Sequence, residues 1–307
     1  MASNGSCETS VMRRAPDSGP QWRGLLRLAR PANIITAHAD ILAGFAASAA
    51  TSAGDLPFLL LSTTGLYGGG IVFNDVCDAD LDRLERPERP IPSGLVSPGT
   101  AAVFGILLLG LGIVSALRVS LLSGFIAAAT AATALLYDRF GKHRSFFGPV
   151  NMGLCRALNL MLGISAGASI ERWHWLLAAI PLCYIAGVTT LSAGEVKGGS
   201  RSSAVASCAW LAAGTVVFLV LADFRGWRSV FCIPFAAILL FRIGNPFARA
   251  FRSHSPAAIR HAVKAGVLSL IVLDATLAAL YTGLWYPLGI LCLYIPAMGL
   301  AKLFAVT

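Results

Sequence analysis

Charged residues are scarce in this 307-residue sequence. They make up 13% of the chain, whereas soluble globular domains carry about 25%. Hydrophobic residues account for 56%, and the mean hydropathy is +0.71. The composition therefore argues against a soluble enzyme and excludes disordered, collagen-like and small disulfide-stapled chains.

The sequence also has no cysteine motif and has fewer acidic than basic residues. The seven cysteines are scattered, and no two have the CxxC spacing, so the sequence predicts neither a zinc site nor a disulfide framework. The 15 acidic residues face 24 lysines and arginines, which gives a formal net charge of +9. In a soluble chain this excess would suggest nucleic-acid binding. Here membrane topology explains it better, and we expect no nucleic-acid partner.

Long apolar runs are what the sequence has in abundance, and such runs are typical of transmembrane helices. Ten candidates lie at about 33–53, 56–77, 98–117, 120–137, 147–170, 173–193, 204–222, 228–247, 264–283 and 285–304. Residues 1–21 have no apolar core of the signal-peptide type and are expected to form a disordered cytoplasmic tail. We predict an all-α, polytopic membrane helical bundle, with a main domain at 22–284 and an additional C-terminal span in 285–307.

Basic residues alternate sharply between the loops. With ten spans, 19 of the 24 lysines and arginines fall on one side and four on the other. Because basic loops stay in the cytoplasm, we expect both termini and the loop after the second run to be cytoplasmic.

Six of the 15 acidic residues lie within that loop, in the sequence NDVCDADLDRLERPERPIPSG at 74–94. Asn74, Asp78 and Asp82 are spaced i, i+4, i+8, which on a helix sets one amide and two carboxylates on a single face. Like charges at this spacing repel unless a hard cation lies between them, and Mg²⁺ in proteins is held by one or two carboxylates plus phosphates and waters. We therefore expect Mg²⁺ and a diphosphate substrate, with Asp78 and Asp82 as catalytic residues.

Other cytoplasmic loops supply matching groups. Arg86 and Arg89 offer forked donors to phosphate oxygens. The candidates in two further loops are Tyr137, Lys142, Glu195 and Lys197. The alternative is that all of these are solvated loop charges.

Ionisable residues within the runs are a second signal, because an intramembrane charge is costly and therefore a functional candidate. His38 could serve function or structure. Asp40 and Arg156 lie deeper and can pair with each other, and Asp274 has no evident partner in the sequence. Gly65 and Gly70 lie in a glycine-rich stretch that favours close helix packing over a bend toward a cavity.

The chain resembles the UbiA family of intramembrane prenyltransferases over about residues 24–284. The N-D-x-x-D-x-x-x-D pattern of residues 74–82 followed by the basic, proline-rich loop carries the resemblance. So do the opening LARPANIITAHADILAG and the segment LLYDRFGKHRSFFGPVNMGLCRALNLMLG. The resemblance implies nine core helices around a lipid-accessible cavity, with isoprenyl diphosphate and Mg²⁺ under a cytoplasmic cap. It assigns Asn74, Asp78, Asp82 and Glu195 to the metal, and Glu195 joins Asp78 and Asp82 as a predicted catalytic residue. It also adds Asn33 and Arg156 to the predicted substrate-binding set of Arg86, Arg89, Tyr137, Lys142 and Lys197.

The second acidic motif departs from the family pattern. The family usually carries D-x-x-x-D after the sixth span, whereas this chain reads LSAGE, with Leu191 in the first carboxylate position and Glu195 in the second. This feature and the ADILAG and VKAGVLSLIVLDA stretches resemble the Ebo-type branch of the family.

Three functions remain open at this point. The first is transfer of an isoprenyl group, with release of pyrophosphate, to a lipophilic acceptor that we expect to be aromatic. The second is a terpene cyclase that ionises the same substrate. The third is a non-catalytic protein that binds or transports a prenylated lipid.

Overall fold

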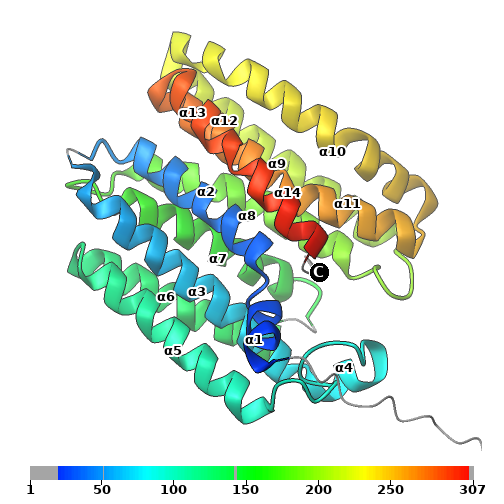
Figure 1. The fold of residues 1–307 in the computed structure, drawn as a ribbon. Coiled ribbons are helices and arrows are strands. Elements are labelled where there is room, and N and C mark those ends of the chain that lie inside the picture. The colour runs from blue at the N-terminus through cyan, green and yellow to red at the C-terminus, as the bar shows by residue number, and fades with distance from the viewer. Residues whose placement is uncertain (1–19, 51, 142–143, 304–307) are drawn as a thin grey trace, which may run out of the picture.

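The computed structural model describes residues 20–50, 52–141 and 144–303, and every regular element in them is a helix (Figure 1). The α-helices are α1 (Gln21–Ala29), α2 (Pro31–Ala47), α3 (Leu56–Cys77), α4 (Ala79–Glu85), α5 (Pro98–Leu117), α6 (Leu121–Leu136), α7 (Phe147–Ile164), α8 (Arg172–Ser192), α9 (Arg201–Arg225), α10 (Ile233–Ser253), α11 (Pro256–Leu268), α12 (Leu270–Thr282), α13 (Trp285–Cys292) and α14 (Tyr294–Leu303). Three short helical turns join them: η1 (Ala53–Asp55), the π-helical η2 (Tyr137–Gly141) and η3 (Gly226–Cys232). The predicted all-α bundle is confirmed.

Each predicted apolar run lies mostly in helix. Within the described ranges, seven helical stretches are long and apolar enough to cross a membrane. One of these, Arg201–Ser253, contains two of the predicted runs, and the last, Trp285–Leu303, coincides with the proposed additional span. The number of spans stays a prediction. Nearly all of the predicted tail, residues 1–19, lies outside the described residues.

Proline and serine set several helix starts. Pro98 and Pro256 occupy the first helical position, where the missing N–H costs no hydrogen bond. Ser97 and Ser255 precede them and accept hydrogen bonds from the backbone N–H groups of Thr100 and Ala258, which are typical N-cap contacts. The sequence therefore fixes where α5 and α11 begin.

The helices run side by side, with α12 in the interior between α2 and α10 (Figure 1). Residues 270–280 of α12 are all buried. Glycines allow the closest contacts: a Cβ on Gly65 of α3 would lie only 2.4 Å from the carbonyl oxygen of Leu108 in α5. The prediction that this glycine stretch serves helix packing is confirmed at Gly65.

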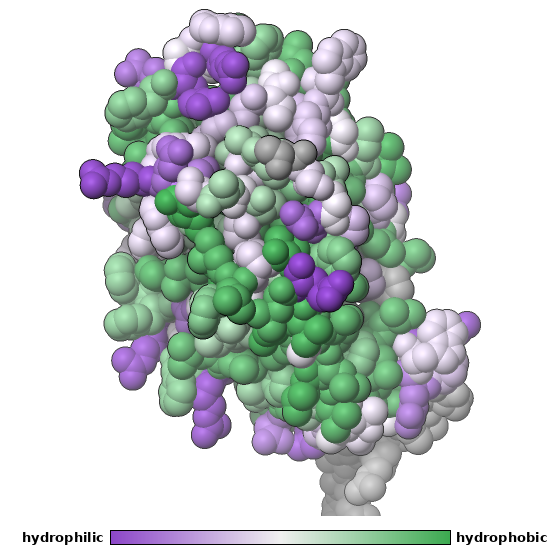
Figure 2. All heavy atoms as spheres, turned by 90° about the vertical axis from the view of Figure 1, so that its left-hand side faces the viewer, coloured by the Kyte–Doolittle hydropathy of each residue, from purple (hydrophilic) through white to green (hydrophobic). Residues whose placement is uncertain are grey.

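The outer surface is strongly apolar. Large hydrophobic side chains that are more than half exposed include Val103, Ile106 and Leu107 of α5, Phe125 of α6, Val216 of α9 and Phe241 of α10. Figure 2 shows one face on which hydrophobic side chains predominate and hydrophilic ones gather in small groups. Apolar surface this extensive marks contact with lipid or another apolar partner.

Two local features differ from the prediction. The run at 264–283 is not one helix, because α11 begins at Pro256 and a break at Ser269 separates it from α12. The chain before the first run forms α1, whose Leu28 packs with Ala79 of α4 and Leu95 of the following loop. Helices α1 and α4 thus cover the same end of the bundle (Figure 1).

Candidate functional site

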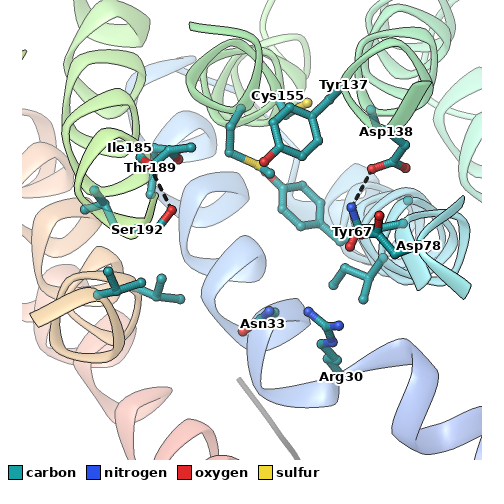
Figure 3. Close-up of a pocket in the computed structure, with 18 of the residues that line it drawn as sticks. Arg30, Asn33, Tyr67, Asp78, Tyr137, Asp138, Cys155, Ile185, Thr189 and Ser192 are labelled. Atoms are coloured by element: carbon teal, nitrogen blue, oxygen red, sulfur yellow. Dashed lines mark hydrogen bonds between the residues drawn. The ribbon is translucent and has the colours of Figure 1, made fainter. Parts of the chain in front are cut away.

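A cavity of about 440 Å³ opens among α2, α3, α4, α6, α7, α8 and α11. Its polar end is lined by Arg30, Asn33, Asn74, Asp78, Asp82, Glu85, Arg86, Arg89, Tyr137, Asp138 and Glu195. Its apolar wall includes Leu66, Ile71, Met152, Ile185, Val188, Val263 and Val267. One space therefore joins charged groups of both signs to a hydrophobic surface (Figure 3).

The acidic motif enters this cavity from α3 and α4. Helix α3 ends at Cys77, Asp78 forms the turn, and α4 starts at Ala79. The backbone bonds continue across the junction, from Asp78 N to Asn74 O at 3.0 Å and from Asp82 N to Asp78 O at 2.8 Å. The predicted placement of Asn74, Asp78 and Asp82 on one face holds, because all three line the cavity.

Two arginines neutralise part of this motif. Arg89 Nη1 donates to Asp82 Oδ2 at 2.6 Å and to Asp75 Oδ1 at 3.3 Å. Arg30 Nη2 donates to the same Asp75 oxygen at 2.6 Å. Arg30 has φ of 43° and separates α1 from α2, and this unusual conformation for a side-chain-bearing residue is typical of strained positions near functional sites. The proline-rich loop thus folds its arginine back onto the acidic face.

The end of α6 forms another part of the wall. The chain widens there into the π-helical turn η2, a geometry often found at functional sites, and both Tyr137 and Asp138 line the cavity. Asp138 Oδ1 accepts a hydrogen bond from Asn74 Nδ2 at 2.8 Å. Asp138 is 5% exposed. Our sequence reasoning did not assign it, although its place directly after Tyr137 was a usable signal.

The α8 side supplies one carboxylate. Thr189 and Ser192 of α8 line the cavity, and Glu195 follows from the loop. Leu191, in the position of the missing carboxylate, is 2% exposed and packs in the main hydrophobic core. Burial raises the pKa of Glu195, and the positive charges of Arg86 and Arg260 oppose this rise only in part.

Some of the other predicted site residues line the cavity, and others do not. Asn33, Arg86 and Arg156 line the cavity. Lys197 does not line it and is exposed. The reason is local, since the turn that buries Glu195 directs the chain two residues later toward solvent. Lys142 lies outside the described residues.

Arg156 connects the cavity wall to a buried polar network. Its Nη1 donates to Asp40 Oδ2 and its Nη2 to Thr36 Oγ1, at 2.9 and 2.8 Å. Asn159 Nδ2 donates to the same Asp40 oxygen at 2.9 Å. The Tyr67 ring lies under the guanidinium, 4.7 Å from ring centroid to Cζ. The predicted pairing of Asp40 with Arg156 is confirmed.

Two other ionisable residues within the predicted spans, His38 and Asp274, also contact polar side chains. His38 Nε2 is hydrogen-bonded to Thr64 Oγ1 at 2.8 Å, and Asp274 lies beside Asp40. Both contacts join α2 to a neighbouring helix.

The donor atoms around the cavity fit a hard divalent cation. Carboxylate and amide oxygens are the ligands that Mg²⁺ prefers, usually with phosphate and water oxygens. Asp78, Asp82 and Glu195 supply carboxylates from two elements, and Glu195 Oε1 is buried without a hydrogen-bond partner. Within the described residues, no three His, Cys, Asp or Glu side chains are grouped closely enough to hold a metal ion. A cation in this cavity would therefore need further oxygen ligands from a bound molecule or from water.

Known proteins resemble this chain both in sequence and in structure. A digeranylgeranylglyceryl phosphate synthase of Metallosphaera sedula is 32% identical over 176 residues, which are 56% of this chain and 61% of that protein. A solved structure from work on digeranylgeranylglyceryl phosphate synthase in membranes has a TM-score of 0.63 and 21% identity, and the match covers 86% of this chain and 98% of that one.

A UbiA homolog from Archaeoglobus fulgidus bound to GPP and Mg²⁺ has a TM-score of 0.51 and 16% identity, covering 92% of this chain and 96% of that chain. At such identities the likeness shows the fold. The sequence pattern of the UbiA prenyltransferase family matches residues 40–263. Because this match includes well over half of the chain, the protein belongs to the UbiA prenyltransferase family and is an integral, multi-pass membrane protein.

Proposed function

We propose that the protein is a Mg²⁺-dependent prenyltransferase that moves an isoprenyl group from an isoprenyl diphosphate to a lipophilic acceptor. The allylic carbon–oxygen bond breaks, pyrophosphate leaves, and the acceptor forms a new bond to that carbon with loss of its proton. One observation carries the proposal: a single cavity joins a cluster of carboxylates and arginines to an apolar wall.

The charged end of the cavity suits the diphosphate. Arg86 and Arg89 line it, and guanidinium groups pair with phosphate oxygens through two parallel hydrogen bonds. Asp78, Asp82, Glu195 and the amide of Asn74 are the ligands that would hold Mg²⁺. When bound, Mg²⁺ supplies the positive charge that stabilises the leaving pyrophosphate.

The apolar wall suits the isoprenyl chain. Leu66, Ile71 and Val263 come from three helices and face the same space. An apolar cavity also excludes water, which protects a reactive allylic cation from hydrolysis. The substrate class is supported by the related structures bound to GPP or DMAPP with Mg²⁺.

The acceptor and the branch of the family remain predictions. The sequence suggested an aromatic acceptor and the Ebo-type branch, whereas the relatives' names point to a glycerol phosphate lipid as acceptor. Both are lipophilic nucleophiles. We also propose that the termini and acidic loops are cytoplasmic, that 22–284 is the prenyltransferase domain, and that 285–307 adds a span.

The test is Mg²⁺-dependent release of pyrophosphate by purified protein in lipid nanodiscs, measured across isoprenyl diphosphates of increasing length. Acceptors are offered separately, as a prenylated glycerol phosphate and as a pooled lipophilic aromatic extract. Release that requires one acceptor establishes the transferase and identifies the acceptor class.

Two other results would overturn the proposal. Release without acceptor, accompanied by a cyclised hydrocarbon, establishes a cyclase. Absence of release with every substrate, while a tritiated isoprenyl diphosphate still binds, favours the non-catalytic lipid-binding role. Leu191 is the observation behind that alternative, because it leaves α8 without a carboxylate.

A further inference from the structure

The cavity wall contains one carboxylate beyond the two acidic motifs. Asp138 lies at the end of α6, and its hydrogen bond to Asn74 fixes it beside the first motif. Asn74 is one helical turn before Asp78, since Asp78 N donates to Asn74 O. Figure 3 shows Asp138 and Asp78 at the same side of the cavity. Asp138 is thus close to the proposed metal ligands without belonging to either motif.

The α8 side has a matching deficit. Its cavity face presents Ile185, Val188, Thr189 and Ser192, none of which carries a charge. Leu191 faces the hydrophobic core instead. The only α8-side carboxylate in the described cavity wall is Glu195, which lies beyond the helix end.

Glu195 gives an independent sign that this end of the cavity receives a positively charged ligand. Its side chain is 9% exposed, and Oε1 is buried without a hydrogen-bond partner. An unsatisfied buried carboxylate oxygen is costly. A cation bound across the cavity would satisfy it.

We propose that Asp138 is a ligand of the divalent cation that binds with the diphosphate, and that it supplies from α6 the carboxylate that α8 lacks. The cation site then lies between the α3–α4 junction, the end of α6 and Glu195. This inference rests on the proposed function, and it assigns to η2 the role of presenting a metal ligand. It also explains how the chain can bind metal with Leu191 in the second motif.

The experiment measures binding of Mn²⁺, a spectroscopic substitute for Mg²⁺, by electron paramagnetic resonance in the presence of geranyl thiolodiphosphate, which resists cleavage. The decisive variant is Asp138→Asn. It keeps an oxygen that can accept the hydrogen bond from Asn74 and removes only the charge. We expect the Mn²⁺ dissociation constant to rise roughly tenfold or more, because metal affinity follows ligand charge.

A matched control is Asp80→Asn, which removes one carboxylate from the same region. The Asp80 side chain is 92% exposed and forms an ion pair with neighbouring Arg83. Its loss should leave the Mn²⁺ dissociation constant within twofold of the original protein. This control separates coordination from the general effect of charge near the cavity.

A rescue variant adds Ser192→Asp to Asp138→Asn. Ser192 lines the cavity from α8, so this change returns a carboxylate to the side that lacks one. We expect the rescue to recover much of the lost Mn²⁺ affinity. A merely structural role of Asp138 predicts no recovery. If Asp138→Asn does not yield folded protein, Asp138→Ser is measured in its place, and unchanged Mn²⁺ affinity then overturns the proposal.

The same titration on Asp78→Asn distinguishes two kinds of failure. Weaker Mn²⁺ binding in Asp78→Asn with unchanged binding in Asp138→Asn overturns the role of Asp138 alone. Unchanged binding in both variants overturns the metal site and with it the proposed function.

Discussion

The molecule contains charged groups in two settings, the buried network around Arg156 and the mouth of the cavity. In the network, the Asp40 and Asn159 side chains are fully buried, and Asp40 Oδ2 accepts hydrogen bonds from both Asn159 and Arg156. At the mouth, Asp78, Asp82 and Glu195 line open space, and Glu195 Oε1 has no hydrogen-bond partner. Asp40 Oδ1 of the network also has no partner, but Asp40 does not line the cavity. The first arrangement joins α2 to α7, and the second leaves capacity for a ligand.

This difference shows that an intramembrane charge alone does not identify a functional site. Burying a charge costs free energy, so a buried charge needs a partner. Removing one member of a buried pair destabilises the protein, because the other charge is left without compensation. Arg156 borders the cavity, yet both of its terminal nitrogens are already bonded. The useful criterion is whether the polar group faces a cavity with bonding capacity left over.

The largest effect on activity is expected at the mouth. Replacing Asp78 with Ala removes a proposed Mg²⁺ ligand and should lower pyrophosphate release by about 10²–10³-fold or more, as expected for loss of transition-state charge stabilisation. The thermal unfolding midpoint should change little, because Asp78 borders open space and lies at a helix junction. Both quantities can be measured on the same purified sample.

The outcome also tests the comparison itself. Full activity in Asp78→Ala would remove the metal assignment. A large drop in the unfolding midpoint would instead place Asp78 with the structural charges of the bundle interior.

The largest effect on stability is expected in the network. Arg156→Met leaves Asp40 buried without its cation, and breaking such a pair typically costs about 3–5 kcal/mol. We expect a lower thermal unfolding midpoint in detergent. Because removing both partners takes away the uncompensated charge, the double variant Arg156→Met with Asp40→Leu should recover part of the loss.

A double variant that is no more stable than Arg156→Met would show that the network does not act as a pair. The burial of Asp40 would then need another explanation, such as its position beside Asp274.

Arg89 at the mouth shares one property with each setting: it is paired with a carboxylate, as Arg156 is, and it lines the cavity, as Asp78 does. A hydrogen bond to a charged group contributes about 1.5–3 kcal/mol. Arg89→Ala should therefore raise the KM for the isoprenyl diphosphate by roughly tenfold to a hundredfold. Arg89→Lys keeps the charge but loses the fork, so we expect an intermediate KM. Equal KM values for both variants would show that charge alone is not what Arg89 provides.

Much of this architecture was predictable because hydrophobic runs and prolines act locally. The all-α bundle, the start of α5 at Pro98 and the shared face of Asn74, Asp78 and Asp82 all follow from spacing. The role of Leu191 was harder to judge, since a spacing of four within LSAGE does not show that the helix rotates Leu191 into the core. Asp138 was missed because its neighbour Asn74 is 64 residues away in sequence.

The smallest effect is expected at Lys197, which differs sharply in exposure from Glu195 in the same turn. Glu195 is buried against the cavity, whereas Lys197, two residues on, is exposed and outside the cavity wall. Exposed charges contribute little to binding or stability. Lys197→Ala should leave the KM for isoprenyl diphosphate and the unfolding midpoint nearly unchanged, while Glu195→Gln in the same assay weakens Mg²⁺-dependent release. A KM increase of tenfold in Lys197→Ala would mean that the loop closes over the bound diphosphate and brings this side chain to it.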